Sequence, residues 1–158
     1  MKRERKPLSK KEKSELDSLL DSILDPSLFH YGSDRREVAR YDKRENMYGG
    51  NGSVYLLQMF NKGELVNNRI GAYMILPEKG DSVGLHTHGN RKEQELYVVV
   101  HGYGIYSEKD SEEGDVRNYG IKKGSVTTVR GNGYHAVKNS GNEPLVIFVI
   151  TTNEPEKE

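Results

Sequence analysis

The stretch that decides the fold spans residues 80–102, GDSVGLHTHGNRKEQELYVVVHG. His86 and His88 stand two positions apart, so on a β-strand both imidazoles point to the same face. Glu95 opens a run rich in valine and tyrosine, which are residues that favour strands. Two imidazoles and a carboxylate on neighbouring strands form a suitable ligand set for a divalent metal ion. The stretch therefore predicts a metal site built on a β-sheet.

A second stretch, residues 124–141, reads GSVTTVRGNGYHAVKNSG and supplies a fourth candidate ligand, His135. Three imidazoles with one carboxylate suit manganese, iron, nickel, copper or zinc better than magnesium or calcium. An octahedral ion with these ligands keeps two adjacent positions open, whereas zinc with four protein ligands tends toward a closed tetrahedral site. We therefore expect manganese, iron or nickel, with zinc as the alternative. A divalent ion beside a single carboxylate would favour a small anionic, oxygen-rich ligand.

The composition limits the class of protein. With 158 residues, of which 34% are hydrophobic, the chain can bury one core and form a single domain. Basic and acidic residues number 24 each, so no excess positive charge is available to bind nucleic acid or an anionic membrane. The absence of cysteine excludes disulfides and thiolate ligands. No apolar run approaches the ~20 residues that span a bilayer, and we expect a soluble, cytoplasmic protein.

From residue 49 onward, short β-type runs alternate with glycine, asparagine and proline. Turn sequences such as NKGE, PEKGD and RGNG separate these runs, because glycine, asparagine and aspartate adopt turn conformations at low cost. Many short strands without long helices between them predict an antiparallel sandwich or barrel over residues 49–153, followed by a tail at 154–158. The predicted strands are residues 53–60, 70–76, 83–88, 95–101, 104–107, 116–121, 126–130, 135–138 and 145–151.

The first 48 residues are predicted to form a helix and an arm. Ser9 and Glu12 have the spacing of a capping box, and Asp25-Pro26 is expected to end the helix. One apolar face carries Leu16, Leu19, Leu20, Ile23 and Leu24. Residues 27–50 are interpreted as a loop or arm with one short strand near 38–41. Its two charged clusters, DRRE at 34–37 and DKRE at 42–45, are interpreted as solvated faces.

The two ligand-bearing stretches resemble the two motifs of the cupin superfamily. The first motif is G-x5-H-x-H, then a glutamate and x6-G, and it is matched by Gly80, His86, His88, Glu95 and Gly102. The second motif is G-x5-P-x-G-x2-H-x3-N, and it is matched by Gly124, His135 and Asn139. The resemblance covers residues 50–152. It implies an all-β, double-stranded β-helix (the jelly-roll or cupin barrel), here with an N-terminal α-helical extension.

The chain departs from these motifs in three places. Six residues separate His88 from Glu95, where the family usually has three or four, so Glu93 is an alternative acidic ligand. The extra residues predict a longer loop over the mouth of the site. Arg130 stands at the proline position and Asn132 at the second glycine position of the second motif. Because asparagine tolerates positive φ better than most residues, the turn is predicted to be altered rather than lost.

Two functional hypotheses follow. The resemblance implies metal-dependent decarboxylases, dioxygenases or isomerases that act on a small anionic metabolite. Since no acid/base pair stands out in the sequence, catalytic residues are not assigned, and a non-catalytic small-molecule sensor is the alternative. Tyr97 shares the face of Glu95 and is predicted to contact substrate or pack in the core. Arg130 is predicted to bind an anionic substrate or to lie solvated at the barrel rim.

A homodimer is also predicted. Val98 and Val100 make the strand apolar on the face opposite Glu95, and a strand that is apolar on both faces is buried on both sides. The second layer would be the N-terminal arm or a partner sheet. The resemblance to cupins favours a dimer.

Overall fold

The structure is a computed structural model that describes residues 5–29, 35–89 and 92–153. Residues 90–91, in the loop predicted over the mouth of the site, and the predicted tail at 154–158 lie outside the described residues. The elements are, in chain order, β1 (Arg5–Lys6), α1 (Lys10–Asp21), β2 (Leu28–Phe29), β3 (Arg35–Arg36), β4 (Arg40–Glu45), the 3-10 helix η1 (Met47–Gly49), β5 (Ser53–Gln58), β6 (Gly71–Leu76), β7 (Ser82–Thr87), β8 (Glu93–His101), β9 (Tyr103–Lys109), β10 (Arg117–Lys122), β11 (Val126–Val129), β12 (Tyr134–Asn139) and β13 (Leu145–Asn153).

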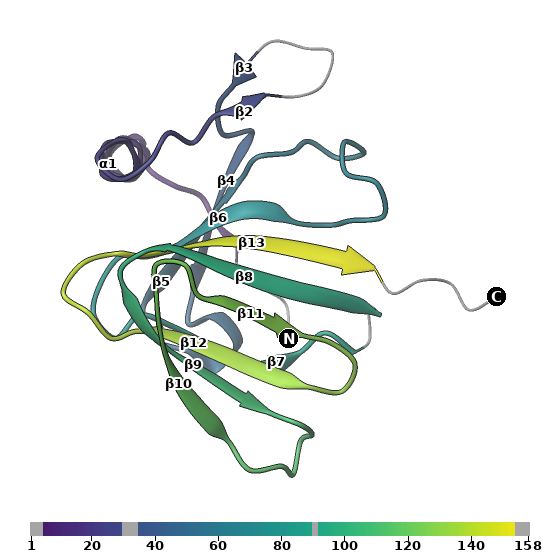
Figure 1. The fold of residues 1–158 in the computed structure, drawn as a ribbon. Coiled ribbons are helices and arrows are strands. Elements are labelled where there is room, and N and C mark those ends of the chain that lie inside the picture. The colour runs from purple at the N-terminus through teal and green to yellow at the C-terminus, as the bar shows by residue number, and fades with distance from the viewer. Residues whose placement is uncertain (1–4, 30–34, 90–91, 154–158) are drawn as a thin grey trace.

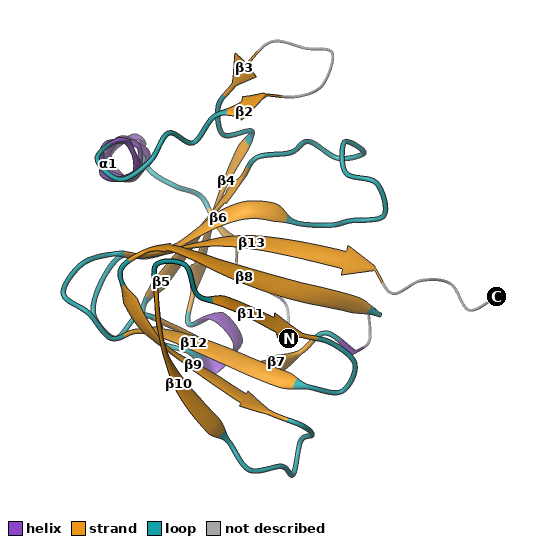
Figure 2. Cartoon of the chain, in the orientation of Figure 1, coloured by secondary structure: helices purple, strands orange, loops and turns teal. Residues whose placement is uncertain are grey.

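Two antiparallel sheets form the body of the protein (Figures 1 and 2). The larger has the strand order β1-β4-β5-β6-β13-β8-β11, and the smaller has the order β10-β9-β12-β7. Strands β2 and β3 pair separately as a short hairpin. The nine predicted strands correspond to β5 through β13. The fold is the predicted all-β, double-stranded β-helix with an N-terminal helix.

The main core lies between the two sheets. Strands of the larger sheet contribute alternate residues such as Leu56, Met74 and Ile147, and strands of the smaller sheet contribute Val83 and Val137. All of these side chains are buried. The period-2 alternation of apolar residues along each strand therefore directs one set of side chains to the interior.

Helix α1 packs on the outer face of the larger sheet. The predicted capping box is present, since the Ser9 hydroxyl accepts from the Glu12 amide at 3.1 Å and the Glu12 carboxylate accepts from the Ser9 amide at 2.8 Å. The helix ends at Asp21, four residues before the predicted stop, because the chain leaves the helix at Ser22. Leu16 and Leu20 are buried in a second apolar cluster that also includes Val100. No helix in the described part of the chain is long and apolar enough to cross a membrane.

The interpretation of residues 27–50 as a loop with solvated charges is wrong for residues 40–45. Strand β4 pairs with β5 over its whole length, so the larger sheet extends across the boundary predicted at residue 49. Asp42 is 7% exposed and Arg44 is 6% exposed, because these two side chains point to the interior. Charged residues on both faces of β4 conceal the polar/apolar alternation that identifies a strand.

Candidate metal centre

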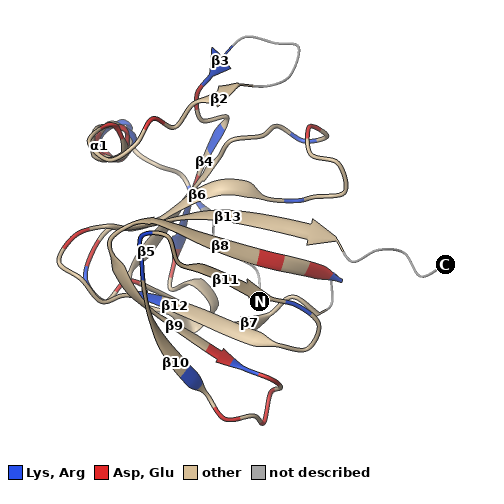
Figure 3. Ribbon diagram, viewed as in Figure 1, with Lys and Arg blue, Asp and Glu red and all other residues tan. Residues whose placement is uncertain are grey.

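The four predicted ligands come from both sheets. His86 lies on β7 and is the registered neighbour of His135 on β12, while His88 follows directly after β7. Glu95 reaches the same point from β8 in the other sheet, near the start of that strand, where Figure 3 shows two acidic bands. All four side chains are buried, and one ligand atom from each lies within 4.8 Å of the others. The structure therefore brings together every residue predicted to hold the metal.

The donor atoms of this cluster face one another. The Nε2 atom of His135 lies 3.1 Å from Nε2 of His86 and 3.3 Å from Nε2 of His88. The Oε1 atom of Glu95 lies 3.3 Å from Nε2 of His135 and 3.4 Å from Nε2 of His88.

The opposite nitrogen of each imidazole has its own partner. Nδ1 of His86 lies 2.8 Å from the Gly84 carbonyl, and Nδ1 of His88 lies 2.8 Å from the Glu93 carboxylate. Because these oxygens only accept, both Nδ1 atoms carry the proton and both Nε2 atoms present a lone pair. Nδ1 of His135 lies 3.2 Å from the Tyr106 hydroxyl. Lone pairs that converge at this spacing repel unless a cation lies between them, so the donor set fits a divalent metal ion.

Burial and charge set the protonation of the cluster. Burial lowers the pKa of His86 to about 3 and also lowers the pKa of His135, so both imidazoles are neutral near pH 7. Burial also acts against protonation of His88, but the adjacent carboxylates Glu93 and Glu95 outweigh it and raise the pKa of His88. Burial opposes ionisation of Glu95, yet the adjacent imidazoles of His135 and His88 hold its pKa well below the usual value. The carboxylate is therefore ionised, as a metal ligand must be.

Two aromatic side chains fix the imidazole rings. Tyr48, from η1, stacks on His86 with ring centroids 4.0 Å apart and an interplanar angle of 8°. Tyr97 stacks on His135 at 5.0 Å and 28°. The η1 segment can lie this close to β7 because residue 84 is glycine, where a Cβ would be 2.0 Å from the Tyr48 carbonyl oxygen.

Comparison with known proteins places this geometry in a family. No protein-family model matches the chain, and no curated protein matches it either. Among solved structures, a predicted oxalate decarboxylase from Thermotoga maritima is similar, with 28% sequence identity and a TM-score of 0.64 over 75% of this chain and 95% of that one. The chain is a cupin.

Two further structures have the same fold. The oxalate decarboxylase of Bacillus subtilis, whose description names Mn(II) centres, is 26% identical with a TM-score of 0.52 and covers 68% of this chain. This cupin corresponds to 27% of that longer chain. The cupin domain of Schizosaccharomyces pombe Cnp3 is 12% identical with a TM-score of 0.54, covers 78% of this chain and 79% of that one, and shows the fold alone.

The two candidate acidic ligands of this cupin lie at different positions relative to the imidazoles. Glu95 faces the three imidazoles, whereas Glu93 lies behind His88 and binds Arg69 through two hydrogen bonds, at 2.7 and 3.2 Å. Glu93 is only 1% exposed. It therefore orients His88 and fixes its tautomer, a role that carboxylates often have beside metal-binding histidines.

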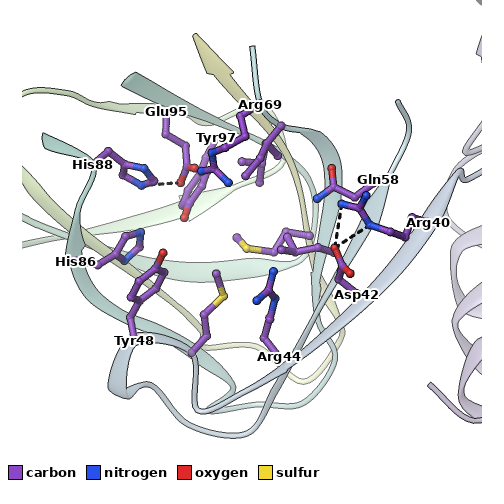
Figure 4. A pocket seen from close by; sticks show the side chains of 15 residues that line it. Arg40, Asp42, Arg44, Tyr48, Gln58, Arg69, His86, His88, Glu95 and Tyr97 are labelled. Atoms are coloured by element: carbon purple, nitrogen blue, oxygen red, sulfur yellow. Dashed lines mark hydrogen bonds and ion pairs between the residues drawn. The ribbon is translucent and has the colours of Figure 1, made fainter. Parts of the chain in front are cut away.

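A cavity of about 160 Å³ opens beside the cluster (Figure 4). Its lining includes Tyr97 and Tyr48, and contact of Tyr97 with substrate stays a prediction. It also includes three arginines from other parts of the chain, Arg40, Arg44 and Arg69. Sequence reasoning missed these three residues. The alternation of Arg40, Asp42 and Arg44 at every second position was the available signal for a strand face.

The remaining predicted residues lie away from this cavity. Arg130 is exposed in the turn after β11 and is not among the residues that line the cavity, so its contact with substrate stays a prediction. His101 is at the far end of β8, with Nδ1 2.9 Å from the Pro144 carbonyl. Asn139 stabilises a turn, because its side-chain amide donates to the carbonyls of Leu76 and Glu143.

Proposed function

We propose that this cupin binds a divalent transition metal through His86, His88, Glu95 and His135 and holds a small carboxylate-bearing metabolite beside it. The observation that carries the proposal is the convergence of three imidazole nitrogens and one carboxylate oxygen at a buried point of an arginine-lined cavity. Manganese, iron or nickel is the expected ion, with zinc as the alternative. The Mn(II) centres named for the Bacillus subtilis decarboxylase support manganese.

The side chains around the cluster have distinct tasks in this proposal. A bound divalent ion would supply Lewis acidity, which polarises a carboxylate and stabilises negative charge next to it. Arg69, held by Glu93, presents a positive charge at the edge of the cavity. Tyr97 and Tyr48 keep the imidazoles in place by stacking. The walls that contain Leu56, Met74 and Val149 limit the amount of water around the ligand.

The relatives suggest a reaction class. The Thermotoga maritima protein is described as a predicted oxalate decarboxylase and the Bacillus subtilis protein as an oxalate decarboxylase. If this cupin is an enzyme, decarboxylation of a small acid is the first activity to test, ahead of dioxygenation or isomerisation.

A non-catalytic binding protein or sensor is the second candidate. The observation that favours it concerns the two carboxylates of the described cavity lining. Asp42 is engaged by Arg40, and Glu95 belongs to the metal cluster. Tyr97 is fully buried and its pKa is raised well above the usual value, so it is a poor proton donor near neutral pH. General acid/base chemistry would therefore need a group from outside this set.

The first experiment is elemental analysis of the purified protein beside His86→Ala, Glu95→Ala and the control His101→Ala. We expect close to one metal ion per chain in the wild type and in His101→Ala, and loss of metal from the two cluster variants. Metal retained in both cluster variants would contradict the site. Incubation of the metal-loaded protein with oxalate and other small acids then separates the two candidates, since only an enzyme consumes them.

We also propose a homodimer. The apolar cluster under α1 includes Val100, whereas Val126, on the neighbouring strand β11, is 61% exposed. Helix α1 thus covers one part of the outer sheet face, and a partner subunit would cover the part near β11. Sedimentation equilibrium at micromolar concentration tests this proposal, and a monomer would contradict it.

A further inference from the structure

We propose that Gln58 binds the end of the ligand that lies away from the metal. The ligand is then a small carboxylic acid with a neutral hydrogen-bonding group, a hydroxyl or a carboxamide, several atoms from its carboxylate. This inference rests on the proposed function, which places the carboxylate at the histidine–glutamate cluster, and it assigns the opposite end of the same cavity.

Gln58 is a buried polar side chain at the end of β5. It is 6% exposed and lines the cavity, and Figure 4 shows its amide directed inward. Its backbone pairs with the neighbouring strands, but its side chain forms no hydrogen bond within residues 5–29, 35–89 and 92–153. Because a buried amide without a partner is costly and uncommon, a hydrogen-bonding group of the ligand would stabilise it.

The strand register places Gln58 in one row with Tyr97. Gln58 is paired with Ala72 on β6, and Ala72 is paired with Val149 on β13. Val149 is in turn paired with Tyr97 on β8, two positions after Glu95. Directly paired residues of an antiparallel sheet point to the same face. The row therefore crosses the inner face of the sheet from Gln58 to the side of the cavity that holds the metal cluster.

The separation of the two ends limits the length of the ligand. Neighbouring strands are ~4.8 Å apart, so three steps place the Cα atoms of Gln58 and Tyr97 roughly 14 Å apart along the sheet. The side chains at both ends point inward and shorten this gap. The cavity of about 160 Å³ is smaller than the ~300–1,000 Å³ of pockets for drug-sized ligands. The ligand is therefore a chain of a few carbon atoms, longer than oxalate.

The wall between the two ends is apolar. Leu56, Met74 and Val149 line the cavity from β5, β6 and β13 and are 5%, 2% and 3% exposed. Since these side chains offer no strong hydrogen-bonding group, the middle of the ligand should be hydrocarbon.

The amide of Gln58 favours a neutral group over a second carboxylate. It presents two N–H donors and one carbonyl acceptor, and a hydroxyl or a carboxamide can pair with both kinds. A carboxylate only accepts, so it would leave the Gln58 carbonyl unpaired. Arg40, the registered neighbour of Gln58, is engaged by Asp42 at 3.4 Å, so a carboxylate already compensates this arginine.

A larger groove of about 630 Å³ adjoins this end of the cavity. It shares Arg40, Gln58 and Arg69 with the inner cavity, so Gln58 lies at the boundary between the two spaces. The neutral end of a bound ligand would then face the groove, where a carboxamide has room as well as a hydroxyl.

The test uses the Mn(II)-loaded protein and titration calorimetry with two pairs of acids. In the first pair, valerate replaces the hydroxyl of 4-hydroxybutyrate by a methyl group. In the second, 4-methylpentanoate replaces the carboxamide of succinamate by an isopropyl group. We expect the polar acid of at least one pair to bind at least about tenfold more tightly, because its apolar counterpart displaces water from Gln58 without replacing the hydrogen bonds. The pair with the larger preference identifies the group that Gln58 binds.

Gln58→Leu should remove the preference while the metal content and the affinities for the two apolar acids stay unchanged. The matched control is Gln94→Leu on β8, which should bind like the wild type. Gln94 lies between two buried glutamates, so it points away from the cavity, and its amide donates to the Thr128 hydroxyl at 2.7 Å.

The wild-type comparison of each pair stands even if Gln58→Leu fails to fold. Equal affinities within both pairs, no binding of the four acids by a metal-loaded protein that binds oxalate, or a preference that persists in Gln58→Leu would overturn the inference alone. Failure to bind metal and every small acid, oxalate included, would overturn the proposed function as well.

Discussion

The two faces of the larger sheet bury different kinds of side chain, although the same strands form both faces. The inner face combines apolar residues with buried polar ones, among them Asp42, Gln58 and Glu95. The outer face presents Leu57, Ile75 and their neighbours to the apolar stripe of α1. Because side chains alternate along each strand, residues for the site and residues for stability interleave in the sequence. The comparison implies that changes on the inner face affect metal binding, and changes on the outer face affect folding.

The largest expected effect is on the cluster itself. His135→Ala removes a ligand whose Nε2 lies within 3.3 Å of two other imidazole nitrogens. Metal affinity should fall by more than about 100-fold, beyond the loss expected for a residue that contacts a ligand rather than the metal. Competition with a chromogenic chelator measures the affinity. The control His101→Ala removes a histidine at the other end of β8. An equal loss of metal affinity in this control would contradict the assignment of His135 as a ligand.

On the outer face, Leu20→Ala should chiefly affect stability. Leu20 has no exposed surface and packs between α1 and the sheet. Truncation of a buried leucine leaves a cavity and should lower the free energy of unfolding of the metal-free protein by about 3 kcal/mol. Urea denaturation measures this change. Metal per folded chain should equal that of the wild type, and a reduced metal content would show that the two faces are coupled.

Glu93→Gln gives an intermediate effect on the inner face. The substitution removes the charge that orients His88 and pairs with Arg69. We expect metal affinity to fall roughly tenfold, less than in Glu95→Gln, because Glu93 acts through a ligand rather than as one. A larger loss in Glu93→Gln than in Glu95→Gln would reverse the assignment of the two carboxylates. Glu143→Gln, near His101, is the matched control.

The smallest expected effect is a pH-dependent loss of stability on the outer face, where Glu12 lies. The Lys43 side chain, together with the Ser9 amide, lowers the pKa of Glu12 to about 2 from its ordinary value of 4.5. Since the folded state has the lower pKa, this contribution to stability is present above pH 4.5 and is lost as the pH falls toward 2. Glu12→Gln should therefore lose stability at pH 6 but little at pH 2.5.

Urea midpoints of the metal-free protein at these two pH values provide the measurement. Glu15→Gln is the control, because Glu15 pairs with exposed Lys11 on the same helix, at 3.7 Å. A pH dependence that is the same in wild type and Glu12→Gln would contradict the role of Lys43.

The sequence predicted the parts of the molecule in which one face of an element is clearly apolar or clearly ligand-bearing. The capping box of α1, the nine strands from β5 to β13 and the convergence of four ligand candidates all followed from spacing. Glu95 could not be separated from Glu93 by spacing, because both carboxylates lie at odd positions of one strand and share its face. Their different roles depend on which side of His88 each one contacts.

The short strand predicted near residues 38–41 overlaps only the start of β4, and the rest of β4 was not predicted, for a physical reason. In RYDKRE, charged residues occupy both the inner and the outer positions, so no difference in polarity marks the buried face. Lys43, on the outer face, bonds to Glu12, and Asp42, on the inner face, pairs with Arg40. Lys43 is compensated by a tertiary partner 31 residues away, and Asp42 by a neighbour on the same strand. Two of the three cavity arginines, Arg40 and Arg44, were missed with the strand.

The division of the cluster between the two sheets also bears on folding kinetics. The strands β7 and β12 belong to one sheet and β8 to the other, so the complete ligand set exists only after the sheets have closed on each other. Contacts this distant in sequence tend to form late and slowly. An ion that needs all four ligands would then stabilise the native state more than the transition state. Metal binding should therefore slow unfolding and leave the rate of folding nearly unchanged.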